Sequence, residues 1–336
     1  MASRVAGRAF VSAPRWGVTG WGAALPTRVV TNADLAEKLD TSDEWVRTRT
    51  GIRERRVGGL VSELAAEAGR HALARAGCDG SDVELLILAT TTPDQAVPAT
   101  SSKVHHALGI AGGAYDLNAA CAGFVYGLVA AAGAIATGTS SVLLVGADCL
   151  SRITDPLDRS TAVLFADGAG AILLQSSTGS REAAELDAPP GMPAGALLGT
   201  DLGVDGTAYE LLGCEHGGYM TMEGSEVFRR AVRITVSSAT AALARSGLKP
   251  DDVALFVPHQ ANLRIIEAAC DRLGIGSERT AVILDRTGNT SAASIPLALA
   301  EAADAGRLSA GDYVLLSGFG AGMTWASAVL RWGSPL

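Results

Sequence analysis

The sequence has few cysteines, and their spacing predicts neither a disulfide framework nor a metal site. Five cysteines are scattered over 336 residues, at positions 78, 121, 149, 214 and 270. Their number is odd, and no Cys-x-x-Cys pair or Cys/His pattern of metal-binding spacing occurs among them. Because structural disulfides belong to oxidising compartments and zinc sites need closely spaced ligands, we expect a cytoplasmic protein with free thiols and no metal.

The sequence also lacks a basic excess and a strongly apolar segment long enough to span a membrane. Its formal net charge is −8, which argues against general nucleic-acid binding. The one uncharged apolar run that approaches the necessary length, residues 119–136, is rich in alanine and glycine. We interpret this run as a helix buried on nearly all faces. Neither a nucleic acid nor a membrane is expected as a partner.

What the sequence does contain is enough apolar material for a large core. It is 48% hydrophobic, and its length suits one large domain or two ordinary ones. The 40 glycines follow no short period, which indicates tight turns and close packing rather than disorder. Only the first residues, 1–15, are expected to form a disordered N-terminal extension.

The segment around Cys121 is the centre of the predicted fold. A short apolar stretch, residues 113–117, leads into the uncharged run 119–136. Cys121 falls in the first turn of the predicted helix, where the helix dipole and unpaired backbone N–H groups stabilise a thiolate. A lone cysteine in such a helix is more often a small buried core residue. Its assignment as a nucleophile therefore depends on the rest of the chain.

The second half of the chain repeats the first. Residues 72–83 match residues 242–253, and at the same spacing Cys121 matches Ser291. This duplication predicts two α/β halves, residues 16–175 and 221–336, joined by a linker with a surface excursion at residues 176–220. The helices at Cys121 and Ser291 should lie side by side at the pseudo-twofold centre.

Polar groups follow the predicted strands of the second half. Pro-His-Gln-Ala-Asn, residues 258–262, follows one strand, and the glycine-rich loop 317–325 follows another. Asn289 precedes the helix that begins near residue 290. Loops at strand ends are where α/β proteins place their sites. By the symmetry of the duplication, the His259 imidazole and the Asn289 carboxamide should converge on Cys121.

These motifs resemble the ketoacyl-ACP synthase III family of the thiolase-like condensing enzymes. The matching stretches run in family order and are residues 43–45, 48–52, 120–124, 167–171, 258–262, 288–294 and 318–325. The resemblance implies a thiolase-like, internally duplicated α/β fold with five layers in the order α-β-α-β-α. It also implies that the chain initiates fatty-acid or polyketide synthesis by joining an acyl-CoA primer to malonyl-ACP, and the sequence leaves the two pathways open.

The resemblance implies roles for the converging residues. Cys121 would take the acyl group from CoA as a thioester, and the backbone N–H groups of Cys121 and Ala321 would form the oxyanion hole. His259 and Asn289 would donate hydrogen bonds to the enolate that forms when malonyl-ACP loses CO₂. CoA is then a substrate, and no cofactor is expected.

The resemblance also places the substrate contacts. A tryptophan beside an arginine run suits stacking on a base and pairing with phosphates. CoA would contact Trp45, Arg49, Arg159, Asn262, Gly224 and Phe228, with the adenine between Trp45 and Arg159. Val97, Phe165 and Phe319 would line the acyl pocket. The family forms homodimers, and Val97 would come from the partner subunit. Docking of the carrier protein would use Arg264, Arg229 and Arg230.

Related activities on the same fold remain open alternatives. A thiolase needs a second active cysteine near the C-terminal glycine-rich loop, and none of the five lies there. A hydroxymethylglutaryl-CoA synthase needs a carboxylate base that the sequence does not place. An ester- or amide-forming acyltransferase would use Cys121 and His259 without needing Asn289, and a cysteine hydrolase would release the acyl group to water.

Overall fold

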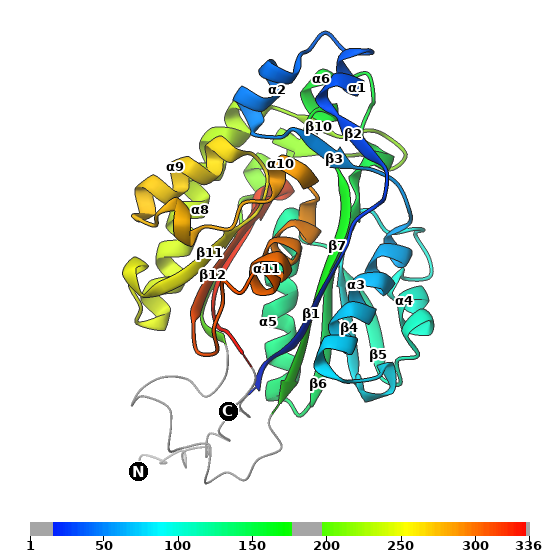
Figure 1. The fold of residues 1–336 in the computed structure, drawn as a ribbon, viewed down its shortest axis with the longest axis vertical. Coiled ribbons are helices and arrows are strands. Elements are labelled where there is room, and N and C mark those ends of the chain that lie inside the picture. Colours follow the sequence, from blue (N-terminus) through cyan, green and yellow to red (C-terminus); the bar gives the residue numbers. More distant parts are fainter. Residues whose placement is uncertain (1–15, 177–196, 334–336) are drawn as a thin grey trace, which may run out of the picture.

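The computed structural model describes residues 16–176 and 197–333. The N-terminal extension expected over residues 1–15 lies outside the described residues, and so does much of the expected linker. Within the described residues, two units of sheet and helix pack together (Figure 1), and four strands of the first sheet have counterparts in the second. No helix among them combines the length and apolar character needed to cross a bilayer.

The first sheet has the strand order β1-β7-β6-β4-β5. Its strands are β1 (Trp16–Ala24), β4 (Leu85–Ala89), β5 (Gly113–Leu117), β6 (Ser141–Cys149) and β7 (Asp167–Ser176). β4 runs parallel to β5 and β6, whereas β7 is antiparallel to β6 and β1. β6 is buried along its whole length, which explains why its sequence is a continuous apolar run instead of an alternating one.

The second sheet has the order β11-β12-β13-β8 and repeats the pairing directions of the first. Its strands are β8 (Leu197–Val204), β11 (Val253–Pro258), β12 (Tyr313–Gly320) and β13 (Thr324–Arg331). β8 therefore occupies the place that β1 has in the first half. The second half thus includes residues from Leu197 onward and does not start at residue 221, so the linker predicted over residues 176–220 was too long.

Two glycines and an aspartate made β8 look like a loop in the sequence. The same feature marks β1, whose glycines let a helix approach closely. A Cβ on Gly20 would lie 2.1 Å from the carbonyl oxygen of Ala72, and one on Gly199 would lie 2.3 Å from that of Ala242. Ala72 and Ala242 are matched positions of the duplication. Gly20 and Gly199, which lie against these two alanines, therefore also correspond, and this match in the sequence could have identified β8 as a strand.

The helices complete five layers, as the sequence predicted (Figure 1). α3 (Val61–Ala76) and α4 (Ser101–Leu108) cover the outer face of the first sheet, and α8 (Gly224–Ser246) and α9 (Leu263–Leu273) cover that of the second. Between the sheets lie α5 (Gly123–Ala136) and α11 (Ser294–Asp304), which share one core cluster with both sheets. α5 can fit there because it is built of small residues: a Cβ on Gly127 would lie 2.5 Å from Leu144.

Short elements gather at one end of the sheets (Figure 1). They are β2 (Val29–Thr31), α1 (Asn32–Ala36), α2 (Asp43–Thr50), β3 (Glu54–Arg56), α6 (Arg159–Ala162), β9 (Leu212–Gly213), β10 (Thr221–Met222) and α10 (Leu284–Thr287). Ser42 caps α2 by accepting a hydrogen bond from the Trp45 backbone N–H at 3.1 Å, and Gly51 ends that helix in the left-handed region. The cap fixes the orientation of Trp45.

The register of the duplication differs by one residue from the sequence match at the centre of the molecule. Ala120 and Ser291 are the two non-glycine residues with positive φ among the described residues, at 49° and 51°. Two residues before each, Asn118 and Asn289 accept a hydrogen bond from the backbone N–H of Ala120 and Ser291, at 3.1 and 3.0 Å. Asn118 thus corresponds to Asn289, and Cys121 to Ala292. Runs of small residues can be aligned equally well one residue apart. The turn with positive φ at a non-glycine residue, which occurs once in each half of the described chain, determines the correct alignment.

Candidate active site

One cavity brings the predicted catalytic residues together. It has a volume of ~860 Å³, and its lining includes Cys121, His259, Asn289, Phe319 and Ala321. A second cavity of ~530 Å³ has Trp45 and Arg49 in its lining. The two cavities have five lining residues in common: Leu164, Met222, Gly224, Phe228 and Asn262. The convergence predicted from the duplication is therefore present, and a path leads from it towards Trp45.

Cys121 lies in a 3-10 turn, residues Ala120–Ala122, immediately before α5 begins at Gly123. The sequence placed it in the first turn of the long helix and expected a stabilised thiolate. Burial instead raises the pKa of the Cys121 thiol to about 12, and the nearby Asp148 carboxylate acts in the same direction. A hydrogen bond with the Ser291 side chain opposes this rise in pKa without reversing it. The resting nucleophile is therefore a thiol.

The glycine-rich loop presses against the Cys121 turn. A Cβ on Gly320 would lie 2.6 Å from the Cys121 backbone nitrogen, so only glycine permits this approach. The Thr324 hydroxyl lies 2.9 Å from the Ala321 carbonyl of its own loop and 3.2 Å from the Ala119 carbonyl of the turn, so its one proton is shared between them. Ala321 follows Gly320 and lines the cavity beside Cys121. This arrangement brings the backbone of the Gly320–Ala321 segment against that of Cys121.

His259 follows β11 and is almost completely buried, with 2% of its surface exposed. Its Nδ1 lies 2.6 Å from the Ser294 hydroxyl, and its ring meets Phe319 edge-on with the ring centres 5.4 Å apart. Burial lowers the pKa of His259 to about 3. The imidazole is therefore neutral at physiological pH and acts as a hydrogen-bonding group without a formal charge.

Asn289 is held so that its amide nitrogen remains available as a donor. Its Oδ1 accepts from the Ser291 backbone N–H at 3.0 Å. Its own backbone donates to the Leu164 carbonyl and accepts from the Ala166 N–H, both at 2.9 Å. Because these bonds fix the side chain and occupy its oxygen, the Nδ2 group is the part of Asn289 that can donate in the cavity.

The CoA contacts implied by the resemblance lie together, with one difference. The guanidinium groups of Arg49 and Arg159 lie 4.5 and 4.9 Å from the centre of the Trp45 ring. The expected slot for an adenine between Trp45 and Arg159 is thus closed by the arginine itself, whose Nη1 donates to the Asp40 carbonyl at 2.7 Å. Asn262 Nδ2 donates to the Arg49 carbonyl at 3.0 Å and so connects α9 to α2.

The three arginines predicted for docking differ in their surroundings. Arg230 forms ion pairs with Glu226 at 2.7 Å and Asp205 at 3.0 Å, and Arg229 also pairs with Glu226. Arg264 is exposed, stacks over Phe228 at 5.4 Å, and pairs with no carboxylate among the described residues. Because Arg264 lies beside the second cavity, it is better placed than Arg230 to meet an acidic partner.

The residues predicted for the acyl pocket do not all line the same cavity. Phe165 is buried and lines the larger cavity together with apolar side chains that sequence reasoning missed, among them Leu150, Ile153, Leu212 and Met220. Two of these residues, Leu212 and Met220, lie in the segment that was predicted to be a linker. No periodic pattern of apolar residues in that segment indicated that they would be part of a site. Val97 is 84% exposed and does not line the cavity of its own chain.

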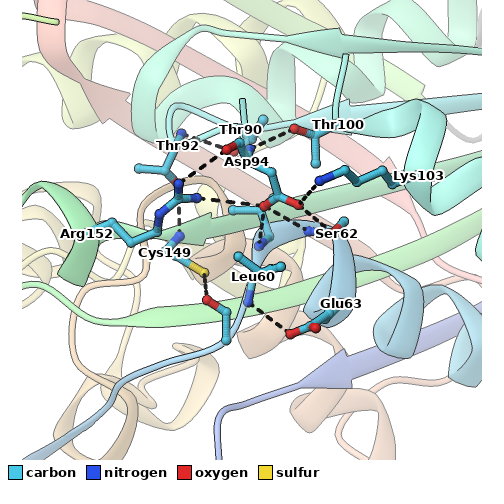
Figure 2. Close-up of polar contacts among 12 residues, drawn as sticks. Leu60, Ser62, Glu63, Thr90, Thr92, Asp94, Thr100, Lys103, Cys149 and Arg152 are labelled. Carbon is cyan, nitrogen blue, oxygen red and sulfur yellow. Dashed lines mark hydrogen bonds and ion pairs between the residues drawn. The ribbon is translucent and has the colours of Figure 1, made fainter. Parts of the chain in front are cut away.

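A buried carboxylate anchors the start of the loop that carries Val97. Figure 2 shows Asp94 among Ser62, Lys103 and Arg152. Asp94 accepts from the Ser62 hydroxyl at 2.5 Å and from the Val61 backbone N–H at 2.9 Å, which caps α3. Burial alone would raise the pKa of Asp94, but the hydrogen bonds from Ser62 and the charge of Lys103 hold it below its usual range. The loop that carries Val97 is thus fixed at Asp94, whereas its tip is exposed.

Comparison with known proteins identifies the family. Residues 115–188 match the family model described as 3-oxoacyl-[acyl-carrier-protein (ACP)] synthase III, and residues 243–332 match the model of its C-terminal part. A beta-ketoacyl-[acyl-carrier-protein] synthase III of Roseiflexus sp. (strain RS-1) is 48% identical over 335 residues, covering 94% of this chain and 98% of the relative.

Solved structures agree with the sequence relatives. The 3-oxoacyl-[acyl-carrier-protein] synthase III of Aquifex aeolicus VF5 superposes with a TM-score of 0.88 at 40% identity, covering 94% of this chain and all of the other. The priming beta-ketosynthase of the R1128 polyketide pathway has the same TM-score at 35% identity, covering 98% of this chain. The chain therefore belongs to the beta-ketoacyl-[acyl-carrier-protein] synthase III family of condensing acyltransferases.

Proposed function

We propose that this chain condenses an acyl-CoA primer with malonyl-ACP through an acyl-Cys121 intermediate and so initiates fatty-acid or polyketide synthesis. The proposal rests on one observation: Cys121, from the first half of the duplicated fold, lines the same cavity as His259 and Asn289, from the second half. A thiol supplies the nucleophile, and the imidazole and the carboxamide supply two donors for an enolate oxygen. A simple acyl transfer would not need the Asn289 donor.

In the first step, Cys121 Sγ attacks the carbonyl carbon of the acyl thioester. The new C–S bond forms, the bond to the CoA sulfur breaks, and the thiol proton ends on the departing CoA. The oxyanion of the tetrahedral intermediate accepts hydrogen bonds from the backbone N–H groups of Cys121 and Ala321. Gly320 supports the proposal because its lack of a side chain lets these two segments approach each other.

In the second step, the bond between the malonyl α-carbon and its carboxylate breaks, and CO₂ leaves. The electron pair remains as an enolate, whose oxygen accepts hydrogen bonds from His259 Nε2 and Asn289 Nδ2. The α-carbon then attacks the acyl carbon on Cys121, the C–S bond breaks, and the sulfur regains a proton. The enolate needs no metal in this scheme, and we propose that no cofactor takes part.

The partners follow from the surroundings of the cavity. CoA would bind along Asn262, Gly224 and Phe228, with its adenine on Trp45 after the Arg159 guanidinium moves aside and its phosphates near Arg49. The carrier protein is acidic, and we propose that it docks at Arg264 with help from Arg229. We further propose a homodimer, and a cytoplasmic location that suits the five free thiols.

The test is mass spectrometry of the intact protein, first with acetyl-CoA and then with malonyl-ACP. We expect an acetyl adduct on Cys121 that persists in buffer and disappears when malonyl-ACP is added, with release of CO₂. Loss of the adduct to water alone would instead identify a cysteine hydrolase. Clearance by an alcohol or amine without CO₂ would identify an ester- or amide-forming acyltransferase.

A further inference from the structure

The Nδ1 of His259 has one hydrogen-bond partner in the part of the chain that the structure describes, the Ser294 hydroxyl. Ser294 is the first residue of α11 and is completely buried. Its Oγ lies 2.6 Å from His259 Nδ1 and also accepts from the backbone N–H of Gln260 at 3.3 Å. A backbone N–H can only donate, so one lone pair of the Ser294 oxygen is already occupied.

The hydroxyl proton of Ser294 then needs an acceptor. Across residues 16–176 and 197–333, the Ser294 hydroxyl forms no hydrogen bond to an acceptor other than His259 Nδ1. If Nδ1 carried a proton, it would occupy the remaining lone pair, and the buried Ser294 proton would have no acceptor. A buried donor without an acceptor is destabilising, whereas an unprotonated Nδ1 satisfies both groups.

We propose that Ser294 is the positioning residue that fixes His259 in the tautomer with the proton on Nε2. This inference rests on the proposed function only for its kinetic consequence, because the tautomer itself follows from the hydrogen bonds. The Nε2–H group is the donor that an enolate oxygen requires. A histidine held in this way has no free lone pair on the cavity side, so it cannot accept the proton of the Cys121 thiol.

The surroundings of the pair keep this arrangement in place. The His259 backbone N–H donates to the Ser317 carbonyl at 2.8 Å. The Gln260 side chain donates to the carbonyls of Pro258 and Ala281, at 2.7 and 3.1 Å, and accepts from the Ile283 N–H at 2.9 Å. The loop that carries His259 is therefore fixed by its own backbone contacts. Removing the Ser294 hydroxyl would free the tautomer and remove the hydrogen bond from the Gln260 backbone N–H, while the other contacts of the loop remain.

The first test is ¹⁵N NMR of the histidine side chains in the wild-type protein, which has five histidines. We expect His259, assigned by its loss in His259→Asn, to show a protonated Nε2 and an unprotonated Nδ1. Ser294→Ala should shift the Nδ1 resonance as the hydrogen bond disappears. A wild-type His259 protonated on Nδ1 would overturn the proposal, whatever reaction the protein catalyses.

The second test compares two partial reactions in Ser294→Ala. Decarboxylation of malonyl-ACP should fall by about 10- to 100-fold, the loss known for partners that orient metal-bound histidines and taken here as the expected scale. Acetylation of Cys121 by acetyl-CoA should keep its rate, and the KM for malonyl-ACP should stay the same. Ser294→Thr, which retains the hydroxyl, should recover part of the decarboxylation rate.

The matched control is Ser238→Ala. Ser238 is buried in α8, its hydroxyl has no hydrogen-bond partner among the described residues, and it does not line the cavity. It should leave both partial reactions unchanged. A parallel loss of both reactions in Ser294→Ala, or no loss of either, would refute the positioning role. A wild-type protein that releases no CO₂ would refute the proposed function, while the NMR result would still decide the tautomer.

Discussion

Loss of solvent around Cys121 and His259 favours the uncharged form of both, although Cys121 is partly exposed to the cavity and His259 is buried. Burial raises the pKa of the thiol to about 12 and lowers that of the imidazole to about 3. A thiolate–imidazolium pair of the kind found in cysteine proteases is therefore not the resting state. The identities of the two residues could be read from the sequence. Their protonation could not, because it depends on how completely the surrounding layers exclude water.

The separation of nucleophile and enolate donors predicts opposite effects for two substitutions. Cys121→Ala should abolish acetylation yet leave measurable decarboxylation of malonyl-ACP, because His259 and Asn289 remain. His259→Ala should acetylate normally and decarboxylate about 10²–10³ times more slowly, the usual loss for one preorganised donor. Radiolabelled acetyl transfer and CO₂ release measure the two steps. Loss of acetylation together with intact decarboxylation in His259→Ala would reverse the assigned roles.

The raised pKa of the Cys121 thiol predicts how its reactivity depends on pH. Below its pKa, the thiolate fraction grows about tenfold for each unit of pH. The rate of Cys121 alkylation by iodoacetamide should therefore climb without a plateau from about pH 6 to pH 9. Mass spectrometry of the Cys121 peptide measures this rate separately from that of the exposed Cys214. A plateau near neutral pH would show that the helix dipole outweighs burial.

At the scale of elements, the limits of a helix or strand were predictable where an apolar run has a clear end. They were not predictable where the element continues into polar residues. The sequence predicts a strand over residues 16–24 and a helix that ends at Gly77, and β1 and α3 have these limits. The apolar run that begins at Ser141 predicts a strand that ends at Gly146, but β6 extends to Cys149 because its pairing with β7 continues past that run. β8 was missed because its stability comes from pairing with β13 and from contact with α8, which no local pattern records.

The approach of the glycine-rich loop to the Cys121 turn predicts a large effect for Gly320→Ala. The added Cβ would meet the Cys121 backbone nitrogen at 2.6 Å, so the loop must retreat and the two backbone donors must separate. Acetylation should slow by about 10²–10³, the usual effect of losing an oxyanion donor. Stopped-flow or rapid-quench measurement of acetyl-enzyme formation gives this rate.

Gly133→Ala is the matched control for this substitution. Gly133 lies in α5, and a Cβ there would have no neighbour within 4 Å. The control should acetylate normally and gain about 0.5–1 kcal/mol in the free energy of unfolding, because alanine favours a helix. If Gly320→Ala acetylates as fast as Gly133→Ala, the loop does not form the oxyanion hole.

At the scale of the whole molecule, the site exists because two copies of one unit pack against each other. The strained turns at Ala120 and Ser291 come from corresponding positions, yet one half supplies the thiol and the other the imidazole and the carboxamide. The sequence match between the halves was enough to predict this convergence. It could not give the register at the centre, because alanine and serine runs match equally well one residue apart.

The exposed loop that carries Val97 predicts a second subunit. Its tip, Ala96-Val97-Pro98, is exposed, whereas Asp94 at its base is buried by four partners. A firmly held apolar tip suits insertion into a neighbouring chain, so we expect a homodimer. Light scattering at micromolar concentration should give twice the chain mass of 34.2 kDa. A stable monomer of full condensing activity would argue against the dimer and against any role of Val97 in catalysis.

The size of Val97 predicts the range of primers. The resemblance to the family implies that a phenylalanine at this position, donated by the partner subunit, closes the acyl pocket in many members that prefer acetyl groups. Valine is smaller by roughly four carbons, each worth about 0.8 kcal/mol when buried, and a longer primer can fill that space and gain a comparable amount. We therefore expect butyryl- or isobutyryl-CoA to be used at least as well as acetyl-CoA, and Val97→Phe to shift the preference to acetyl-CoA.

The measurement is kcat/KM for acetyl-, butyryl-, isobutyryl- and hexanoyl-CoA in the wild type and in Val97→Phe. Val97→Ala is the companion variant, because it enlarges the same space and should improve the use of hexanoyl-CoA. A wild type that strongly prefers acetyl-CoA, or a profile that neither substitution alters, would show that the pocket ends elsewhere.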